Sequence, residues 1–430
     1  MIRREKLAAL FGVLLGLISL ATRAELTVQI TQGVEGGIPI AVVPFGGQQG
    51  LGSENIGSIV SADLARSGRF KTLSEDAMLE QPTSPEQVQF RTWQALGQDN
   101  LAIGQVQQTG PGQFAAQFHL FDAVRGTLLT TYRIPFTAPE VRKTAHRIAD
   151  IIYQQLTGEP GAFATRVAYV TVSGDGPRNR QYMLQVADTD GFNPQSIITS
   201  REPVMSPAWS PDGRQIAYVS FENKTAAIFI QTLATGERQK VSEMPGINGA
   251  PAWSPDGSQL ALTLSKDGNP DIYVMNVASR SLRRVTDHFA IDTEPAWSRD
   301  GSTIVFTSDR GGKPQLYTVP AGGGQAQRLT YEGAYNARGV FSPDGKSLAM
   351  VHGNGNDFRI AVMDLQSKHL RVLTKGTLDE SPGFAPNGSM ILYASRTNGA
   401  GQLSAVSIDG KVRQSLRIDS GEVREPAWSP

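Results

Sequence analysis

The sequence predicts a small α/β domain followed by a six-bladed β-propeller, and three observations lead to this prediction. A Pro-Ala-Trp-Ser-Pro-Asp-Gly motif, or a close variant of it, begins six times at intervals of 43 or 44 residues, which is the length of a four-stranded propeller blade. Residues 25–157 instead alternate patterns typical of strands and of helices. Glycine and proline number 45 and 25, and charged residues make up only 19% of the chain, as expected for many short strands joined by tight turns.

Residues 1–24 follow the plan of a secretory signal peptide. Three basic residues precede an apolar run, residues 7–20, and the small residues Thr22 and Ala24 precede the expected cleavage site. The apolar run is shorter than the roughly 20 residues that a membrane-spanning helix needs. We therefore expect cleavage, export to the periplasm and a mature chain that does not insert into a membrane.

Composition excludes several function classes. The chain has no cysteine, which excludes disulfides, thiol catalysis and a lipid-modified cysteine after cleavage. Without residues 1–24 the chain holds 36 basic and 39 acidic residues, a net charge of −3. Nucleic acid is therefore not an expected partner.

Each repeat contains the turn and the strands of one blade. The motifs start at Pro207, Pro251, Pro295, Gly339, Pro382 and Pro426. After each motif comes a strand-like run such as residues 215–220, then a polar loop, a second run such as residues 228–233, and a short third run. Proline presets φ, aspartate can hydrogen-bond the nearby backbone and glycine accepts a positive φ, so the motif predicts a turn between strands. The aromatic position of the motif is expected to pack between blades; it holds Trp209, Trp253, Trp297, Phe341, Phe384 and Trp428.

The two ends of the repeat region are predicted to complete one blade. The sixth motif, residues 426–429, stands alone, whereas residues 166–172, 182–187 and 196–199 form three strand-like runs that lack a motif strand. Pairing the last strand with these three gives six blades and leaves no open sheet edge at the seam. We therefore place the propeller at residues 166–430.

The α/β domain is predicted at residues 25–157, with residues 158–165 as a short linker. Strands are expected at residues 27–30, 38–45, 101–106, 114–121 and 128–134. Helices are expected at residues 54–66, at residues 85–96 after the capping residue Ser84, and at residues 138–156. Thr137 and Glu140 form a capping-box pattern at the start of the third helix, and Gly158 can end it.

The first mature residues form a separate feature. Residues 25–37 combine a strand-like run with Gly33, Gly36 and Gly37. Such a segment can add itself to the sheet of a partner or fold back on its own domain, or it can be a plain edge strand. These alternatives stay open from the residues alone.

The sequence contains no pattern typical of an active site. Its histidines lack metal-ligand spacing, and it has neither a nucleophile elbow nor a phosphate loop; the histidines are His119, His146, His288, His352 and His369. Two acidic turns, residues 188–191 and 266–269, lack the loop of a calcium-binding EF-hand. We therefore expect a protein that is not an enzyme and that has no cofactor or catalytic metal. A cation at one mouth of the channel is a separate hypothesis, because acidic residues precede the motif strands there: Asp292, Glu294, Asp379, Glu380 and Glu425.

Two further stretches add a family resemblance. Ile38–Phe45 (IPIAVVPF) opens the α/β domain and Leu156–Phe163 (LTGEPGAF) leads to the propeller; together with the repeats, they resemble the TolB family over nearly all of the mature chain. The resemblance implies a monomeric periplasmic scaffold that binds the lipoprotein Pal on its propeller and the inner-membrane-anchored TolA through its mature N-terminus. It also implies a role in outer-membrane integrity and in constriction during cell division, with colicin translocation domains as further partners.

The repeat adds a location to this implied function. Loops that lead into the motif strands must open on one face of a propeller, so the residues expected to bind Pal surround one mouth: Met205, Ser206, Ile247, Asn248, Gly249, Ala250, Asp292, Thr293, Glu294, Glu380 and Ser381. The residues expected to bind TolA are Glu25, Leu26, Thr27, Val28, Gln29, Ile30 and Thr31. Residues 25–36 could then alternate between the body and a free state, with Pal shifting the balance.

Two other function classes stay open. A propeller-type peptidase or oligosaccharide lyase would need a nucleophile domain or clustered histidines. A carbohydrate-binding propeller would need tryptophans for sugar stacking, and four of the five tryptophans lie in the repeat.

Overall fold

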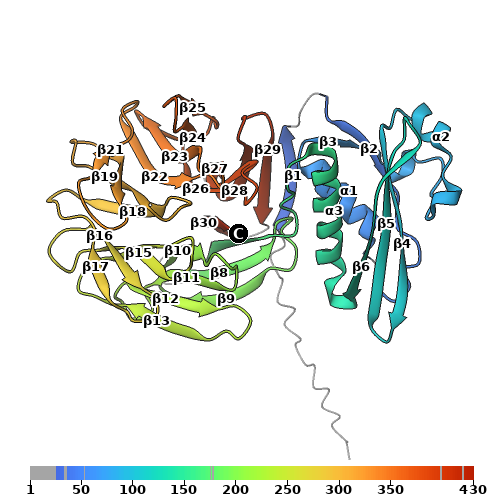
Figure 1. Ribbon diagram of the computed structural model, residues 1–430. Coiled ribbons are helices and arrows are strands. Elements are labelled where there is room, and N and C mark those ends of the chain that lie inside the picture. Colours follow the sequence, from blue (N-terminus) through green and yellow to red (C-terminus); the bar gives the residue numbers. More distant parts are fainter. Residues whose placement is uncertain are drawn as a thin grey trace, which may run out of the picture.

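The computed structural model describes residues 26–32, 36–52, 54–174, 176, 179–397, 400–418 and 421–430. The predicted signal peptide and Glu25 lie outside these ranges. Figure 1 shows an α/β domain beside a propeller, with the first strand, β1, between them. None of the helices in the described ranges is long and apolar enough to cross a membrane.

A five-stranded mixed sheet forms the centre of the N-terminal domain, in the order β3-β2-β4-β5-β6. β2 is parallel to β3 and β4, and the remaining pairs are antiparallel. The strands are β2 (Ile38–Val42), β3 (Phe70–Thr72), β4 (Asn100–Gly110), β5 (Gln113–Asp122) and β6 (Thr127–Thr137). The sequence predicts all of them except β3, whose three residues are too few to show alternation.

Helices cover both faces of this sheet. α1 (Ile56–Arg66) and α3 (Val141–Thr157) lie between the sheet and the propeller, and α2 (Phe90–Ala95) lies on the far side (Figure 1). α1 and α3 bury apolar residues in one shared cluster, which includes Ile148 of α3, and α2 buries Trp93 in a second cluster. The face that meets the propeller is therefore helical.

Local capping sets the ends of the two long helices. Asn55 Oδ1 accepts the backbone N–H of Gly57 at 2.8 Å, so α1 begins two residues after its predicted start. Thr137 and Glu140 form the predicted capping box, with the Thr137 N–H donating to Glu140 Oε2 at 3.0 Å. A 3₁₀ turn (Ala138–Glu140) leads into α3, and Gly158 ends the helix at φ +77°.

The helix predicted at residues 85–96 is wrong in its first half. The cap at Ser84 leads only into a 3₁₀ turn, Pro85–Gln87, and Val88 then adopts an extended conformation. The Gln87 side chain turns back to accept the Thr83 N–H at 2.8 Å, which closes the turn on itself instead of continuing the helix. A further 3₁₀ turn spans Glu75–Ala77.

Six four-stranded blades form the propeller, which confirms the predicted architecture. The first two complete blades consist of β10 (Val204–Trp209), β11 (Gln215–Ser220), β12 (Ala227–Thr232) and β13 (Arg238–Ser242), and of β14 (Asn248–Trp253), β15 (Gln259–Leu264), β16 (Asp271–Asn276) and β17 (Leu282–Arg284). The next two consist of β18 (Asp292–Trp297), β19 (Thr303–Ser308), β20 (Gln315–Pro320) and β21 (Gln327–Arg328), and of β22 (Tyr335–Phe341), β23 (Ser347–Asn354), β24 (Asp357–Asp364) and β25 (Leu370–Val372). The fifth consists of β26 (Asp379–Phe384), β27 (Met390–Thr397), β28 (Ala400–Ser407) and β29 (Arg413–Ile418).

The closing blade joins both ends of the repeat region, as predicted. It contains β7 (Arg166–Ser173), β8 (Gln181–Asp188), β9 (Gln195–Ser200) and, innermost, β30 (Glu422–Trp428). β30 begins at Glu422, four residues before the motif, so the strand also includes the residues that lead into the motif. The motif tryptophans pack between blades as expected: the indole N–H of Trp253, for example, donates to the backbone oxygen of Ala208 in the preceding blade at 3.1 Å.

β1 (Leu26–Gln32) extends the fifth blade to five strands. It pairs antiparallel with β29, and Ile30 lies opposite Gln414. The prediction of a plain edge strand is therefore confirmed, whereas the alternative in which the segment folds back on its own domain is wrong, because the sheet that β1 extends belongs to the propeller. Gly36 has φ +88°, in the left-handed region that favours glycine, whereas Gly33 lies outside the described residues.

Candidate partner-binding site

The innermost strand of every blade bulges at the same place. In β10, for example, the pairing register shifts between Met205 and Ala208. The bulge residue has a positive φ in all six blades although none of the six is glycine: Ser206, Ala250, Glu294, Arg338, Ser381 and Glu425. Positive φ is uncommon for such residues, and bulges re-aim side chains. All six residues line the central channel, whose cavity measures about 600 Å³.

Arg338 connects four blades across this channel. Its Nε donates to Glu294 Oε1 at 2.7 Å, and one terminal nitrogen donates to Glu425 Oε2 at 3.2 Å and also to the Ser381 hydroxyl. Burial would lower the pKa of Arg338, but the charges of Glu425 and Glu294 outweigh it and raise the pKa. The sequence suggested a bound cation near five acidic residues. At two of these, Glu294 and Glu425, the neighbouring positive charge is the side chain of Arg338.

Two of the residues predicted at the mouth have their side chains inside the blades. Asp292 is fully buried and accepts a hydrogen bond from Arg310 at 2.6 Å. Asn248 Oδ1 accepts the Ser242 hydroxyl at 2.7 Å and the Met244 N–H at 2.9 Å. These side chains fix the loops that enter the inner strands because they stand at the first position of β14 and β18. Asp379, at the same position of β26, is also buried.

The other predicted mouth residues reach the surface or the channel. Ile247 and Glu380 are exposed. The remaining seven are half-buried, and all lie at or directly before a bulge: Met205, Ser206, Gly249, Ala250, Thr293, Glu294 and Ser381. Residues from four blades therefore contribute to one mouth.

Sequence reasoning predicted Ile247 at this mouth but missed three further exposed apolar side chains, Phe289, Ile291 and Tyr331. Phe289 is 87% exposed, Tyr331 72%, Ile291 51% and Ile247 48%. These four residues, called the apolar rim below, lie in three consecutive loops that lead into β14, β18 and β22. Ile291 follows Ile247 by one repeat of 44 residues, and large apolar residues at matched positions of otherwise polar loops were the signal available.

Comparisons with known proteins agree with this architecture. Residues 26–129 match the family model described as the TolB amino-terminal domain, and residues 153–430 match the TolB beta propeller domain. The Tol-Pal system protein TolB of Methylococcus capsulatus is 75% identical over 407 residues, which cover 95% of each chain. That of Thioalkalivibrio sulfidiphilus is 61% identical over 434 residues, which cover 100% of this chain and 99% of the relative. The crystal structure of TolB from Acinetobacter baumannii is 43% identical, with a TM-score of 0.87 over 94% of this chain and 100% of that chain. The chain therefore belongs to the TolB family, a non-enzymatic component of the Tol-Pal system.

Proposed function

We propose that the chain is a periplasmic scaffold that binds Pal at one mouth of the propeller and TolA through its N-terminal segment. The apolar rim is the observation that carries the Pal part of this proposal. Exposed apolar side chains that gather on one face mark interaction surfaces. Polar groups such as Thr293 and Glu380 lie at the same mouth, which matches interfaces with an apolar centre and a polar border.

Two residues of the apolar rim are held in place by neighbouring loops, those between β15 and β16 and between β19 and β20. The backbone N–H of Ile247 donates to Ser265 Oγ at 2.7 Å, and that of Ile291 donates to Asp309 Oδ1 at 2.9 Å. The acceptors, like the donors, are one repeat of 44 residues apart. A surface that is ordered before binding loses less conformational entropy in the complex, which favours a stable partner complex at this mouth.

The position of β1 supports the TolA part of the proposal. Among the described strands, β1 pairs with β29 alone, so the backbone N–H and C=O groups of its other edge pair with no described strand. TolA could pair with this segment or compete with β29 for it. Glu25, the remaining predicted contact, lies outside the described residues.

The fifth blade connects the two proposed sites. Its innermost strand, β26, carries Glu380 and Ser381 at the mouth, and its outermost strand, β29, holds β1. A shift of this blade on Pal binding would change the balance between bound and free β1. In the periplasm this would let Pal occupancy control TolA recruitment during envelope constriction.

Capture of solubilised Pal on immobilised protein tests the first part. The double variant Phe289→Ser/Ile291→Ser should reduce Pal capture at least tenfold, because it removes half of the apolar rim. Val372→Ser is the matched control: Val372 is also an exposed apolar residue, 42% exposed, but it lies on the outer strand β25. Equal capture by the double variant and the control would refute the proposed surface.

Deletion of residues 26–31 tests the second part. TolA capture should be lost while Pal capture is retained, because the apolar rim lies on a different part of the molecule. Hydrogen exchange of β1 should also change when Pal binds. Unchanged exchange would remove the proposed switch, and retained TolA capture would remove the proposed TolA segment.

A further inference from the structure

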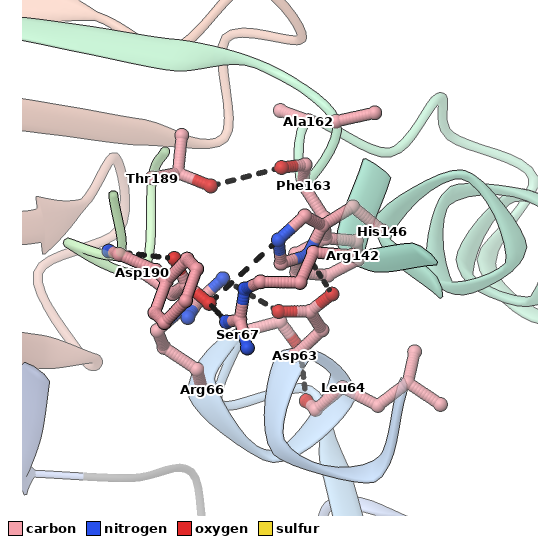
Figure 2. Close-up of polar contacts among 12 residues, drawn as sticks. Asp63, Leu64, Arg66, Ser67, Arg142, His146, Ala162, Phe163, Thr189 and Asp190 are labelled. Carbon is pink, nitrogen blue, oxygen red and sulfur yellow. Dashed lines mark hydrogen bonds and ion pairs between the residues drawn. The ribbon is translucent and has the colours of Figure 1, made fainter. Parts of the chain in front are cut away.

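A buried cluster of charged side chains lies between the N-terminal domain and the propeller (Figure 2). Asp63 belongs to α1, His146 to α3, and Asp190 to the turn that follows β8 of the propeller. The side chains of Asp63 and His146 are only 1% and 2% exposed. Their positions are too far apart in the sequence for any spacing pattern to connect them.

Both ring nitrogens of His146 face carboxylates. Nδ1 lies 2.6 Å from Asp63 Oδ2, and a carboxylate only accepts, so Nδ1 carries a proton. Nε2 lies 3.6 Å from Asp190 Oδ2 and has no hydrogen-bond partner among the described residues. A lone pair at Nε2 would face a negative oxygen, whereas an N–H there would be attracted to it. The geometry therefore favours the doubly protonated, positively charged ring.

The surrounding charges act in both directions, and the carboxylates prevail. Besides Asp63, α1 contributes Arg66, which donates to Asp63 Oδ1 at 2.7 Å and whose positive charge lowers the pKa of His146. Arg142 of α3 binds Asp190 and also Glu54, the latter at 2.9 Å. Asp188 at the end of β8 adds negative charge near the ring, and Asp150 of α3 does so above its raised pKa of about 6. Burial alone would lower the pKa of His146, but the hydrogen bond to Asp63 and the charges of Asp63 and Asp190 outweigh it and raise the pKa.

Two guanidinium groups distinguish this cluster from a metal centre. Arg66 hydrogen-bonds Asp63, and Arg142 hydrogen-bonds Asp190. A divalent ion between the carboxylates would lie against these fixed positive charges. The positive charge in the cluster is therefore supplied by arginine and by the imidazolium ring.

The cluster spans the domain boundary and also reaches the strand that holds β1. Asp190 belongs to the propeller, so its contacts with Arg142 and His146 join the two domains. At the end of α1, the backbone oxygen of Arg66 accepts a hydrogen bond from Gln414 of β29, the residue opposite Ile30 of β1. The position of α1 is thus coupled to the strand on which β1 rests.

We propose that the imidazolium form of His146 holds the N-terminal domain against the propeller, an interaction called the latch below. Loss of its proton loosens this contact and also weakens the pairing of β1 with β29. A raised pKa in the docked state means that the stabilisation is complete below the ordinary histidine pKa of about 6.5 and is lost as pH rises through the docked-state value. Docking therefore weakens toward alkaline pH.

Distance measurements between spin labels test this latch. The chain has no cysteine, so Arg125→Cys in the β5–β6 turn and Arg214→Cys in the propeller, with side chains 80% and 83% exposed, provide unique label sites. Double electron–electron resonance should give one narrow distance distribution at about pH 6 and a broader one at about pH 9. In His146→Gln the distribution should be broad at both values, since glutamine can donate to Asp63 but carries no charge. His119→Gln is the matched control, because His119 contacts Thr131 within the N-terminal sheet, and it should behave as wild type.

A second variant keeps the test decisive if His146→Gln does not fold. Asp190→Asn leaves the Asp63–His146 pair intact and removes the charge on the propeller side. It should lower the pH midpoint of the distance change, and the pKa of His146 measured by NMR, by roughly one unit. A wild-type distribution that is identical at both pH values would overturn the latch. A rise in melting temperature on addition of equimolar zinc that disappears in Asp190→Asn would also overturn it, because it would assign the cluster to a metal.

Discussion

Arg166 and Ser429 exchange two hydrogen bonds across 263 positions of the chain. The Arg166 N–H donates to Ser429 Oγ at 2.9 Å, and the Ser429 N–H donates to the Arg166 oxygen at 2.8 Å. These bonds continue the pairing of β30 with β7, so the last residues complete the blade that begins the propeller. The ring has no free strand edge at this seam, which is how propellers avoid edge-to-edge association.

Deletion of residues 426–430 should therefore lower the melting temperature and weaken Pal capture. It removes the last three residues of β30 from the closing blade, and it also removes the Ala427 oxygen that accepts the Trp209 indole N–H at 3.0 Å. Differential scanning calorimetry and the Pal capture assay measure the two effects. Pro430→Ala serves as the control, because it keeps the strand. Melting and capture that match wild type would contradict the role of the seam.

Repetition made the propeller predictable from the sequence. One turn motif with an aromatic residue two positions after its start recurs in each blade, so an assignment made in one blade carries over to the others. β11 has the predicted bounds, Gln215–Ser220, because the Pro-Asp-Gly turn fixes where the strand begins. The ring closure followed from the incomplete first and last repeats.

Contacts between distant parts of the chain were not predictable in this way. β1 was recognised as a strand, but the sequence contains no signal that its partner is β29, some 390 residues later. Burial of Asn248 and Asp292 was also missed, since position in a repeat places a residue near a mouth without saying which way its side chain turns. His146 was dismissed because its partners are dispersed along the chain and meet only when the domains dock.

Replacement of Trp253 separates ring packing from its hydrogen bond. Trp253→Phe should lower the free energy of unfolding by about 1 kcal/mol, because it loses the bond to the Ala208 oxygen. Trp253→Ala should lower it by about 3 kcal/mol, because it also leaves a cavity between blades. Phe341 and Phe384 at matched positions show that the site accepts phenylalanine. Equal losses in urea denaturation would show that the ring itself contributes little.

Removal of the channel arginine should destabilise the propeller. Arg338→Met leaves Glu294 and Glu425 without their shared partner, and the expected loss in the free energy of unfolding is about 2 kcal/mol for this partly solvated cluster. Adding Glu294→Gln to the same variant should restore part of the stability, because it removes one uncompensated charge. Urea denaturation of the single and double variants measures both effects. An Arg338→Met protein as stable as wild type, or no recovery in the double variant, would contradict the electrostatic role.

Asp150 should make the stability of the protein depend on pH below neutrality. Its carboxylate accepts the linker N–H groups of Phe163 at 2.7 Å and Ala164 at 3.1 Å. Burial nevertheless raises its pKa to about 6, against the lowering effect of these two bonds. The folded state thus binds a proton that the unfolded state, with an aspartate pKa of about 3.9, has already lost. Stability should therefore fall by about 2 kcal/mol as pH rises from about 4 to about 6.

Asp150→Asn should flatten this part of the stability profile. Asparagine has no proton to lose, so the slope between about pH 4 and pH 6 should become smaller even if the variant is less stable at every pH, since its amide can accept only one of the two linker bonds. Urea denaturation at a series of pH values measures the slope. Asp76→Asn, at an exposed position of the same domain, is the control and should keep the wild-type slope. The decrease in stability that deprotonation of His146 causes lies at higher pH, so the effects of Asp150 and His146 are separable. A slope unchanged by Asp150→Asn would assign the low-pH dependence to other carboxylates.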